Sequence, residues 1–388
     1  MLMTMAEHYD RIVVGGGILG LSHAHAALAA GERVVIIERE PRATGATVRN
    51  FGMVWPVGMR MGEDRRRALR SRDTWLDLAR DAGVEVRADG SMHVARHEDE
   101  WAVLQEFTAS DASAGLYCEL LSPEDARRSH AGLRMDDLVG VMRSHTELAI
   151  EPRAAADRIA LWLESQGVTL LRSTVAVRCE GNTVVLADGR TLHATAINVC
   201  SGADLRLLFP EVYETIPVSL CKLQMQRLSP PSWCAGAHVA GGLTLGHYPA
   251  FEACPSLAAV RDRYAREHPF FGEHGIHVMS AQRGDGTLVV GDSHAYGPDV
   301  SPFDRQDIDD AIVDYLGQML DIAGCSVIDR WHGLYAKRMD GQTVLRCEPV
   351  PGVTVVNCVG GAGMTLGPAI AEETIAAKHA VADKEQPA

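Results

Sequence analysis

Three glycines near the start of the chain have the spacing of a phosphate-binding turn. Gly15, Gly17 and Gly20 follow the pattern Gly-x-Gly-x-x-Gly, between an apolar run at 12–14 and an apolar stretch that predicts a helix. In such a turn the first glycine permits the tight bend, the second lets the backbone approach a pyrophosphate, and the third brings helix and strand together. The helix N-terminus then offers free N–H groups to the anion. The spacing therefore indicates a dinucleotide site.

An acidic residue at the end of the next apolar run supports this interpretation over a plain glycine turn. The run at 33–37 ends in Glu38, 23 positions after Gly15. A dinucleotide fold places the carboxylate that binds the ribose hydroxyls at this point, and a carboxylate disfavours a 2′-phosphate. The pattern argues against NADP here and favours FAD or NAD.

A second glycine-rich turn near the end of the chain decides between these two cofactors. The run Gly360-Gly361-Ala362-Gly363 follows an apolar stretch at 353–358 and precedes a predicted helix over 364–379. An NAD enzyme does not need the C-terminal part of the chain to form a second glycine-rich turn facing the cofactor. A flavoprotein that buries its ring system between two domains does need such a turn. We therefore predict FAD.

The remaining elements indicate two interleaved domains. Helices are predicted at 63–82, 98–107, from 123, at 151–166 and at 304–320. Strands are predicted at 90–95, 169–171, 175–179, 183–187, 191–197, 220–227, 243–248, 277–282 and 287–291. We predict an α/β protein with a Rossmann-type FAD-binding domain (1–88, 142–216 and 325–388). An interleaved α+β substrate domain (89–141 and 217–324) is built on an antiparallel sheet.

Composition narrows the class of protein. The 388 residues are 46% hydrophobic and 23% charged, which is typical of globular domains, and the formal net charge is −14. That charge argues against nucleic acid and anionic membranes as partners. Nine cysteines without a regular framework predict reduced thiols and a cytoplasmic protein. We predict no metal site, since His23 and His25 stand two apart and cannot share a helix face.

The order of five motifs resembles the D-amino-acid oxidase superfamily of FAD-dependent oxidoreductases, which includes glycine oxidase and sarcosine oxidase. The resemblance implies FAD, a substrate cavity between the domains, and oxidation of an amine carbon by hydride transfer to the flavin. We predict molecular oxygen as the acceptor, although no motif distinguishes it from another acceptor. The motifs that carry it are 15–20, Glu38, 198–202, 331–335 and 361–365.

Two further stretches resemble a subgroup of this superfamily that is associated with phosphonate catabolism. They are Val48-Arg49-Asn50-Phe51-Gly52-Met53-Val54-Trp55-Pro56 and Gly291-Asp292-Ser293-His294. This resemblance implies an N-methylated 2-aminoethylphosphonate as substrate, with phosphonoacetaldehyde and methylamine as products. The alternatives are a glycine, sarcosine or D-amino-acid oxidase, or a non-catalytic FAD-binding subunit of a hetero-oligomer.

Four departures from the family pattern affect the expected chemistry. Gly333 stands where sarcosine oxidases tether the flavin through a cysteine, so we expect non-covalent FAD. Tyr335 replaces the arginine with which glycine oxidases bind a carboxylate, and Thr365 replaces a sarcosine-type lysine. The usual Gly-His-Gly turn has Ala362 at its centre. The missing carboxylate ligands argue against an ordinary amino acid as substrate.

The resemblance also implies site residues, and no protein side chain needs to be catalytic because the flavin supplies the chemistry. For the substrate, an anionic group needs cations and donors, although a solvated surface or a structural histidine is the alternative for each. The predicted cofactor-binding residues are Gly15, Gly17, Ile18, Leu19, Gly20, Glu38, Arg39, Gly45, Ala46, Thr47, Asn50, Phe51, Gly52, Val175, Cys200, Gly202, Gly333, Gly361, Ala362, Gly363, Met364 and Thr365. The predicted substrate-pocket residues are Arg49, Arg60, His247, Tyr248, His277, Gln282, Tyr335, Lys337 and Arg338.

Overall fold

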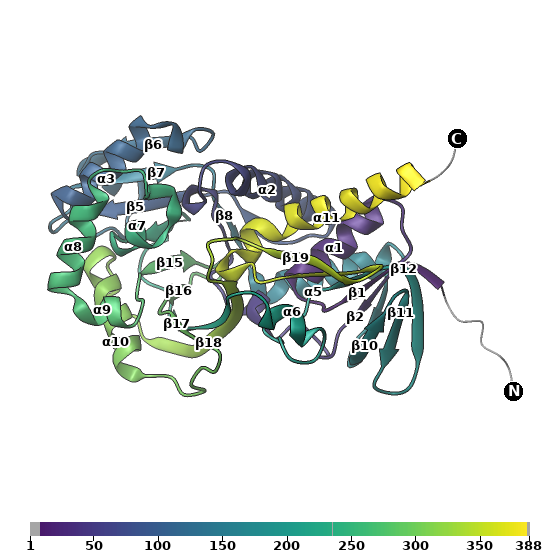
Figure 1. Cartoon of the computed structure of the whole chain (residues 1–388). Helices are drawn as coiled ribbons and strands as arrows, with labels where there is room; N and C mark the ends of the chain where they lie inside the picture. Colours follow the sequence, from purple (N-terminus) through teal and green to yellow (C-terminus); the bar gives the residue numbers. More distant parts are fainter. Residues whose placement is uncertain (1–7, 235, 386–388) are drawn as a thin grey trace, which may run out of the picture.

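Two large β-sheets organise the chain (Figure 1). A computed structural model describes residues 8–234 and 236–385. The first sheet has eight strands. Its central strands run parallel, in agreement with the predicted Rossmann-type fold. These strands are β10 (Ala176–Glu180), β11 (Thr183–Leu186), β12 (Thr191–Val199), β1 (His8–Val14), β2 (Val34–Ile37) and β9 (Thr169–Leu171), with β20 (Val353–Asn357) beside β12 and β19 (Leu345–Val350) beside β20.

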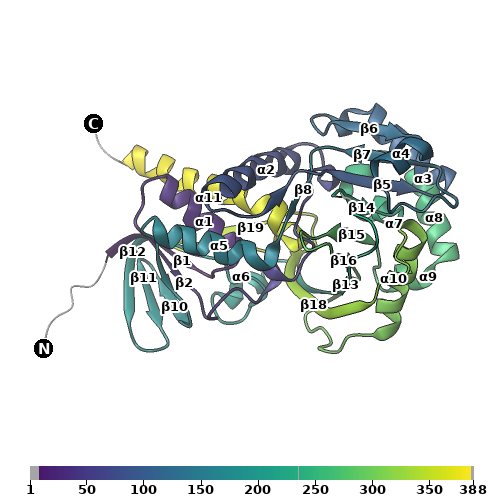
Figure 2. The same ribbon diagram turned by 180° about the vertical axis from the view of Figure 1, so that it is seen from behind.

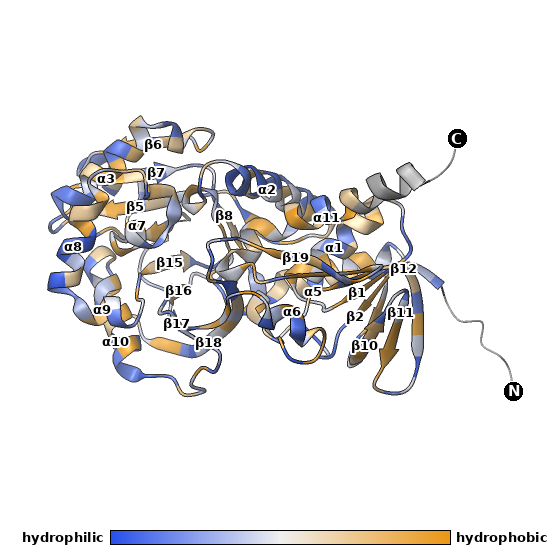
Figure 3. Ribbon diagram, in the orientation of Figure 1, coloured by the Kyte–Doolittle hydropathy of each residue, from blue (hydrophilic) through white to orange (hydrophobic). Residues whose placement is uncertain are grey.

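Alternating apolar side chains bury both faces of this sheet. Val13 and Ile36 contribute to a core that also contains side chains of α1 (Ile18–Ala29), α5 (Pro152–Ser165) and α11 (Gly363–Glu385). Their neighbours Ile12, Val35 and Ile37 point the other way, into a core shared with β10, β11 and α6 (Pro210–Glu214). Figure 2 shows α5 lying across the strands. In Figure 3 the strands of this sheet are mostly coloured as hydrophobic, whereas α2 (Glu63–Asp81) is mostly coloured as hydrophilic.

The second sheet is mostly antiparallel, as predicted, with one parallel pair between β14 and β5. Its strands lie in the order β17 (Ala295–Gly297), β13 (Val218–Leu228), β16 (Leu288–Gly291), β15 (Met279–Gln282), β14 (His238–Ala240), β5 (Ser91–Ala95), β7 (Gly140–Ser144) and β6 (Cys118–Leu121). The long β18 (Val327–Arg338) pairs with β13 along almost its whole length. A small third sheet contains β3 (Met53–Val54), β8 (Leu148–Ile150) and β4 (Val86–Arg87).

Six helices pack with strands of the second sheet in two apolar cores. They are α3 (Glu98–Ala109), α4 (Pro123–Ser129), α7 (Leu243–His247), α8 (Leu257–Glu267), α9 (Pro269–Glu273) and α10 (Gln306–Met319). The predicted helix starts at 123 and 151 have the expected caps, because Ser122 and Glu151 accept backbone N–H groups of the first turn. No helix in the described ranges is both long and apolar enough to cross a bilayer.

Three predictions about the second domain need correction. Residues 243–248 form the short helix α7, where we predicted a strand, because the N–H groups of Thr244, Leu245 and Tyr248 bond back to carbonyls three or four residues earlier. An apolar pattern this short fits either element. The strand predicted from His277 begins only at Met279, and β18 belongs to the second sheet although the predicted boundaries gave 325–388 to the FAD-binding domain. Those boundaries otherwise stay a prediction.

Candidate active site

A cavity of about 740 Å³ lies at the carboxyl ends of the parallel strands. The register of the sheet aligns Val14 with both Ile37 and Val199, so the loops after β1, β2 and β12 open at one edge. From this edge the cavity extends to the loops and strands of the second sheet, including β18 and the segment after β16. It therefore has one end on each sheet.

The first glycine turn is built so closely that side chains would not fit. Gly15 has φ +106°, and a Cβ there would lie 2.3 Å from the Cys200 carbonyl oxygen. A Cβ on Gly20 would lie 1.8 Å from the Gly15 carbonyl oxygen. Gly17 precedes α1 and lines the cavity, and the described first turn of α1 carries no acidic residue. The positive end of this helix therefore faces the cavity, as an anionic pyrophosphate requires.

Glu38 is fixed at the end of β2 by two backbone donors. Its Oε2 accepts the N–H of Gly16 at 2.5 Å, and its Oε1 accepts the N–H of Glu40 at 2.8 Å. Residues Glu38 and Arg39 both line the cavity, and the exposed Arg39 forms an ion pair with Asp204 at 2.9 Å. The carboxylate thus stands beside the glycine turn, where ribose hydroxyls would meet it.

The second glycine turn points another helix N-terminus into the same cavity. The chain leaves β20, makes a 3₁₀ turn at Gly360–Ala362 and enters α11 at Gly363. Thr365, in the first turn of α11, accepts the N–H of Trp55 at 3.0 Å and ties this turn to the loop after β3. Negative charge that develops beside this helix end would be stabilised by the helix dipole.

These features fit a dinucleotide flavin. Of the predicted cofactor-binding residues, Gly20 and Gly52 stand behind the cavity wall, and the others line it. A Cβ on Gly52, whose φ is +74°, would lie 1.9 Å from the Ile150 carbonyl oxygen. Gly20 and Gly52 therefore permit close backbone packing, while their neighbours present the backbone to the ligand.

Three histidines and an aspartate meet at the other end of the cavity. The ring of His247 lies 3.8 Å from that of His277 and 4.7 Å from that of His294, measured between centroids. Asp292 Oδ1 lies 3.3 Å from His277 Nε2. His277, Asp292 and His294 are buried, whereas His247 is exposed and lines the cavity. Desolvation lowers the pKa of His277 and that of His294, the latter to about 4, and raises the pKa of Asp292.

Tyrosines surround this cluster. The hydroxyl of Tyr248 donates to the Met279 sulfur at 3.3 Å, and its ring contacts those of Trp55, His247 and His277. Burial raises the pKa of Tyr335 well above its ordinary value, so the hydroxyl stays protonated. Tyr335 also lies against Gly361, where a Cβ would meet the tyrosine hydroxyl at 3.4 Å. This contact joins the two ends of the cavity.

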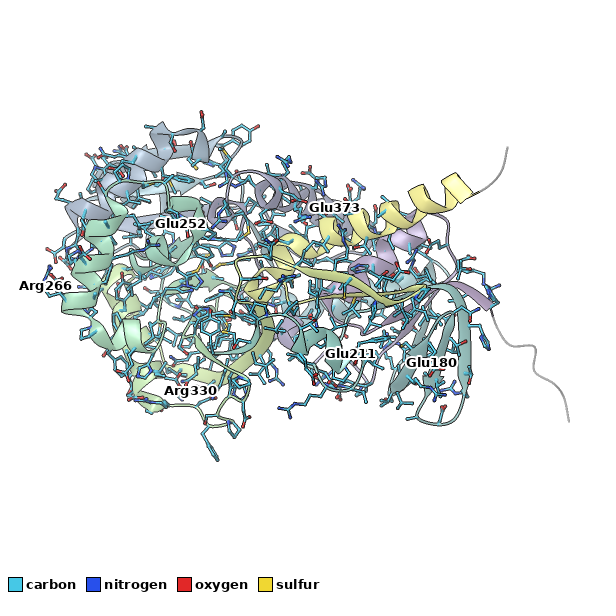
Figure 4. The ribbon with its side chains drawn as sticks, viewed as in Figure 1. Glu180, Glu211, Glu252, Arg266, Arg330 and Glu373 are labelled. Atoms are coloured by element: carbon cyan, nitrogen blue, oxygen red, sulfur yellow. The ribbon has the colours of Figure 1, made fainter. Side chains whose placement is uncertain are left out.

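The four predicted cations all line the cavity, but they differ in their partners. Arg60 is 60% exposed and pairs with Glu252, which Figure 4 labels, at 3.0 Å, and Arg338 pairs with Asp340. Within the described part of the chain, neither Arg49 nor Lys337 has a carboxylate oxygen within 4.0 Å. Arg49 donates to the His332 carbonyl at 3.2 Å, and Lys337 Nζ lies 3.3 Å from the Tyr296 hydroxyl.

One predicted pocket residue lies elsewhere, and two that matter were not predicted. Gln282 is absent from the cavity lining, and its amide donates to the carbonyls of Trp233 and Gly286. Asp292 and His294 line the cavity. In the sequence they form a polar turn after an apolar strand, and this pattern fits a structural turn as well as the edge of a site. The polar run that directly follows the buried β16 was the available signal.

Comparison with known proteins agrees with this architecture. Residues 10–377 match the family model described as DAO, FAD dependent oxidoreductase, and the chain therefore belongs to this family, whose cofactor is FAD. One component of the anaerobic glycerol-3-phosphate dehydrogenase of Escherichia coli (strain K12) is 30% identical over 122 residues, which are 31% of this chain and 22% of that protein. The mitochondrial pyruvate dehydrogenase phosphatase regulatory subunit of Mus musculus is 24% identical over 166 residues, 42% of this chain and 19% of that protein. The chain thus spans only about a fifth of these relatives.

Solved structures match over nearly the whole chain. Glycine oxidase from Bacillus cereus ATCC 14579 has a TM-score of 0.77 at 15% identity, covering 96% of this chain and 95% of that one. Glycine oxidase from Geobacillus kaustophilus has a TM-score of 0.76 at 18% identity, covering 98% and 96%. The reduced L-alpha-glycerophosphate oxidase from Mycoplasma pneumoniae, with FAD bound, has a TM-score of 0.74 at 15% identity, covering 95% and 94%. These likenesses establish the fold.

Proposed function

We propose that this chain is an FAD-dependent amine oxidoreductase that acts on a small anionic amine, with N-methylated 2-aminoethylphosphonate as its substrate. The observation that carries the proposal is a single cavity lined by two helix N-termini and by two cations, Arg49 and Lys337, that have no carboxylate oxygen within 4.0 Å among the described residues. Bound FAD, held non-covalently, would accept a hydride from the carbon that carries the amine. The resulting imine hydrolyses to phosphonoacetaldehyde and methylamine.

The chain's own residues bind and orient such a substrate. Lys337 and Arg49, which no nearby carboxylate neutralises among the described residues, attract the anionic group. The hydroxyl group of Tyr335, kept protonated by burial that raises its pKa, can donate one hydrogen bond, whereas the single O–H of Tyr248 is already directed at the Met279 sulfur. Burial in the cavity favours the neutral form of the amine, which is the form that can lose a hydride.

A glycine, sarcosine or D-amino-acid oxidase is the second candidate, supported by the fold shared with two glycine oxidases. Tyr335 argues against it, because a buried tyrosine occupies the position where the resemblance places a carboxylate-binding arginine. For either candidate we propose molecular oxygen as the acceptor. We also propose a cytoplasmic location and a role in phosphonate catabolism. The location is supported by nine cysteines, all within the described residues, that are free thiols.

Product analysis tests the proposal. Purified protein is incubated in air with N-methyl-2-aminoethylphosphonate, sarcosine, glycine or D-alanine, and aldehyde, methylamine and hydrogen peroxide are measured. We expect phosphonoacetaldehyde and methylamine in equal amounts from the phosphonate. Turnover of glycine or sarcosine without turnover of any amino-phosphonate would overturn the substrate assignment. Bound FAD that no amine reduces would indicate the third alternative, a partner-dependent subunit.

A further inference from the structure

The three histidines at the substrate end of the cavity come from separate segments of the chain, and their rings lie next to one another. One ring nitrogen from each of His247, His277 and His294 can be chosen so that all three lie within 4.8 Å of one another. His247 ends α7, His277 precedes β15 and His294 follows β16, so the fold rather than a local motif brings them together. Backbone hydrogen bonds between His277 and Asp292, at 2.9 and 3.1 Å, hold two of these segments in register.

Buried polar atoms in this cluster lack hydrogen-bond partners. Both ring nitrogens of His277, which is 3% exposed, are unpartnered among the described residues, as is Oδ1 of Asp292, which is 5% exposed. Leaving such atoms unsatisfied destabilises the folded protein, and buried groups of this kind call for a ligand that the protein itself does not supply. Each neutral imidazole offers one lone pair, and a cation between the rings would satisfy these lone pairs and hold Asp292 in its ionised form.

The surroundings of His294 are those of a typical metal ligand. His294 Nδ1 lies 3.0 Å from the Gly275 carbonyl, to which it donates, and its Nε2 lone pair remains free. Metal-bound histidines commonly donate their other ring N–H to a carbonyl in this way, which fixes the ring. Bonds of about 2.0–2.1 Å at tetrahedral angles place two ligand atoms about 3.3 Å apart. The chosen ring nitrogens of the three histidines lie within 4.8 Å of one another, so the rings must move closer together to bind one ion, and Asp292 Oδ1 already lies 3.3 Å from His277 Nε2.

We propose that His247, His277 and His294 bind a divalent transition-metal ion, with zinc as the best fit, and that Asp292 supplies the negative charge of the site. Three imidazoles with an adjacent carboxylate suit zinc, which has no preferred d-electron geometry. His247 lines the cavity, so one coordination position stays open to a ligand from that side. An open position of this kind is typical of metal sites that contact substrate.

This site would also define the substrate class, an inference that rests on the proposed function. Lys337 contributes a second positive charge beside the same three histidines. Its Nζ lies 3.3 Å from the Tyr296 hydroxyl, and the Tyr296 ring stacks against His294 at 6.1 Å. Two cations around one opening favour a group with two negative charges and several oxygens. A phosphonate oxygen on the metal and another at Lys337 would satisfy both.

Metal content tests the site independently of turnover. The FAD-loaded protein is dialysed against a chelator and then titrated with Zn²⁺ or Co²⁺ alone, while bound metal is measured by mass spectrometry and FAD by absorbance. His247→Gln is the first variant, because His247 lines the cavity and its loss leaves the buried core intact. His277→Gln and His294→Gln follow. His145→Gln, at an exposed histidine paired with Glu119, is the matched control.

We expect one metal ion per chain in the wild type and in His145→Gln, and at least tenfold weaker binding in His247→Gln with FAD content unchanged. Wild-type protein that binds Zn²⁺ and Co²⁺ no more tightly than His247→Gln would overturn the site. Metal binding without flavin reduction by any amino-phosphonate would leave the site standing and reject the proposed function. Metal-free protein that oxidises the phosphonate with an unchanged KM would reject the role of the metal in substrate binding.

Discussion

The two ends of the cavity are built in different ways. At the cofactor end the groups that would bind FAD belong to the backbone. They are two glycine turns and two helix N-termini, together with the N–H donors that hold Glu38 in place. At the substrate end they come from side chains of histidine, tyrosine, aspartate and lysine on separate segments. A backbone site needs particular residue types at fixed spacing, whereas a side-chain site needs only that distant segments meet.

Breaking the first glycine turn should have the largest effect. In Gly20→Ala the added Cβ would lie 1.8 Å from the Gly15 carbonyl oxygen, so strand and helix must separate and the pyrophosphate site is lost. We expect protein that folds poorly or carries less than about a tenth of the wild-type FAD, since overpacking a tight backbone contact costs roughly 1–3 kcal/mol or more. Gly272→Ala, where nothing lies within 4 Å of the added Cβ, should retain FAD.

Glu38→Gln weakens the cofactor end without opening it. The carboxylate of Glu38 accepts the N–H groups of Gly16 and Glu40. In the glutamine variant the side-chain NH₂ group must face one of these two N–H groups, so one hydrogen bond is lost. Hydrogen bonds to charged groups contribute about 1.5–3 kcal/mol, so the Kd for FAD should rise about 10- to 100-fold. Isothermal titration of the apoprotein measures this. An unchanged Kd, or an equal loss in a Glu180→Gln variant at an exposed position outside the cavity, would contradict the role of Glu38.

A buried histidine should make the substrate-domain core sensitive to acid. Burial lowers the pKa of His93, packed between Trp55 and Phe251, from its ordinary 6.5 to about 3. The unfolded chain therefore takes up this proton first, and the free energy of unfolding falls as pH decreases from about 6.5 toward 3. Between pH 7 and pH 5 the loss from His93 alone is about 2 kcal/mol.

Urea unfolding at several pH values checks this prediction. In His93→Phe the ring stays apolar at every pH, so the free energy of unfolding should lose about 2 kcal/mol less on acidification than in the wild type. His145→Gln, at an exposed position, should keep the wild-type slope. Identical slopes in His93→Phe and the wild type would show that His93 is not held neutral.

The smallest expected effect lies at the substrate end. Lys337→Met removes a cation that no carboxylate neutralises within the described residues, and KM for the phosphonate should rise about tenfold while FAD content stays constant. Arg60→Met is the comparison, because Arg60 is 60% exposed and already paired with Glu252. Steady-state kinetics separates KM from kcat. Equal effects of the two substitutions would contradict the assignment of Lys337 to the anionic group.

The same contrast explains how far the sequence predicts this protein. The glycine turns, Glu38 and the parallel strands could be predicted because each requirement is local, such as φ +106° at Gly15. The histidine cluster could not, since His247, His277 and His294 come together only through the pairing around β15 and β16. The helix at 243–247 was predicted as a strand because its pattern is too short to distinguish the two. Gln282 was predicted to line the pocket, but the strand pattern alone does not show which side of the sheet a side chain faces, and its amide bonds to the Trp233 carbonyl instead.

The flavin spectrum under anaerobic conditions tests the central claim most directly. N-methyl-2-aminoethylphosphonate, sarcosine and D-alanine are added in turn to purified FAD-loaded protein without oxygen, and the loss of the oxidised flavin absorbance is followed. We expect the phosphonate to bleach the flavin, and we expect sarcosine and D-alanine to leave it oxidised. Bleaching by sarcosine or D-alanine, with none by the phosphonate, would contradict a substrate end built for a phosphonate.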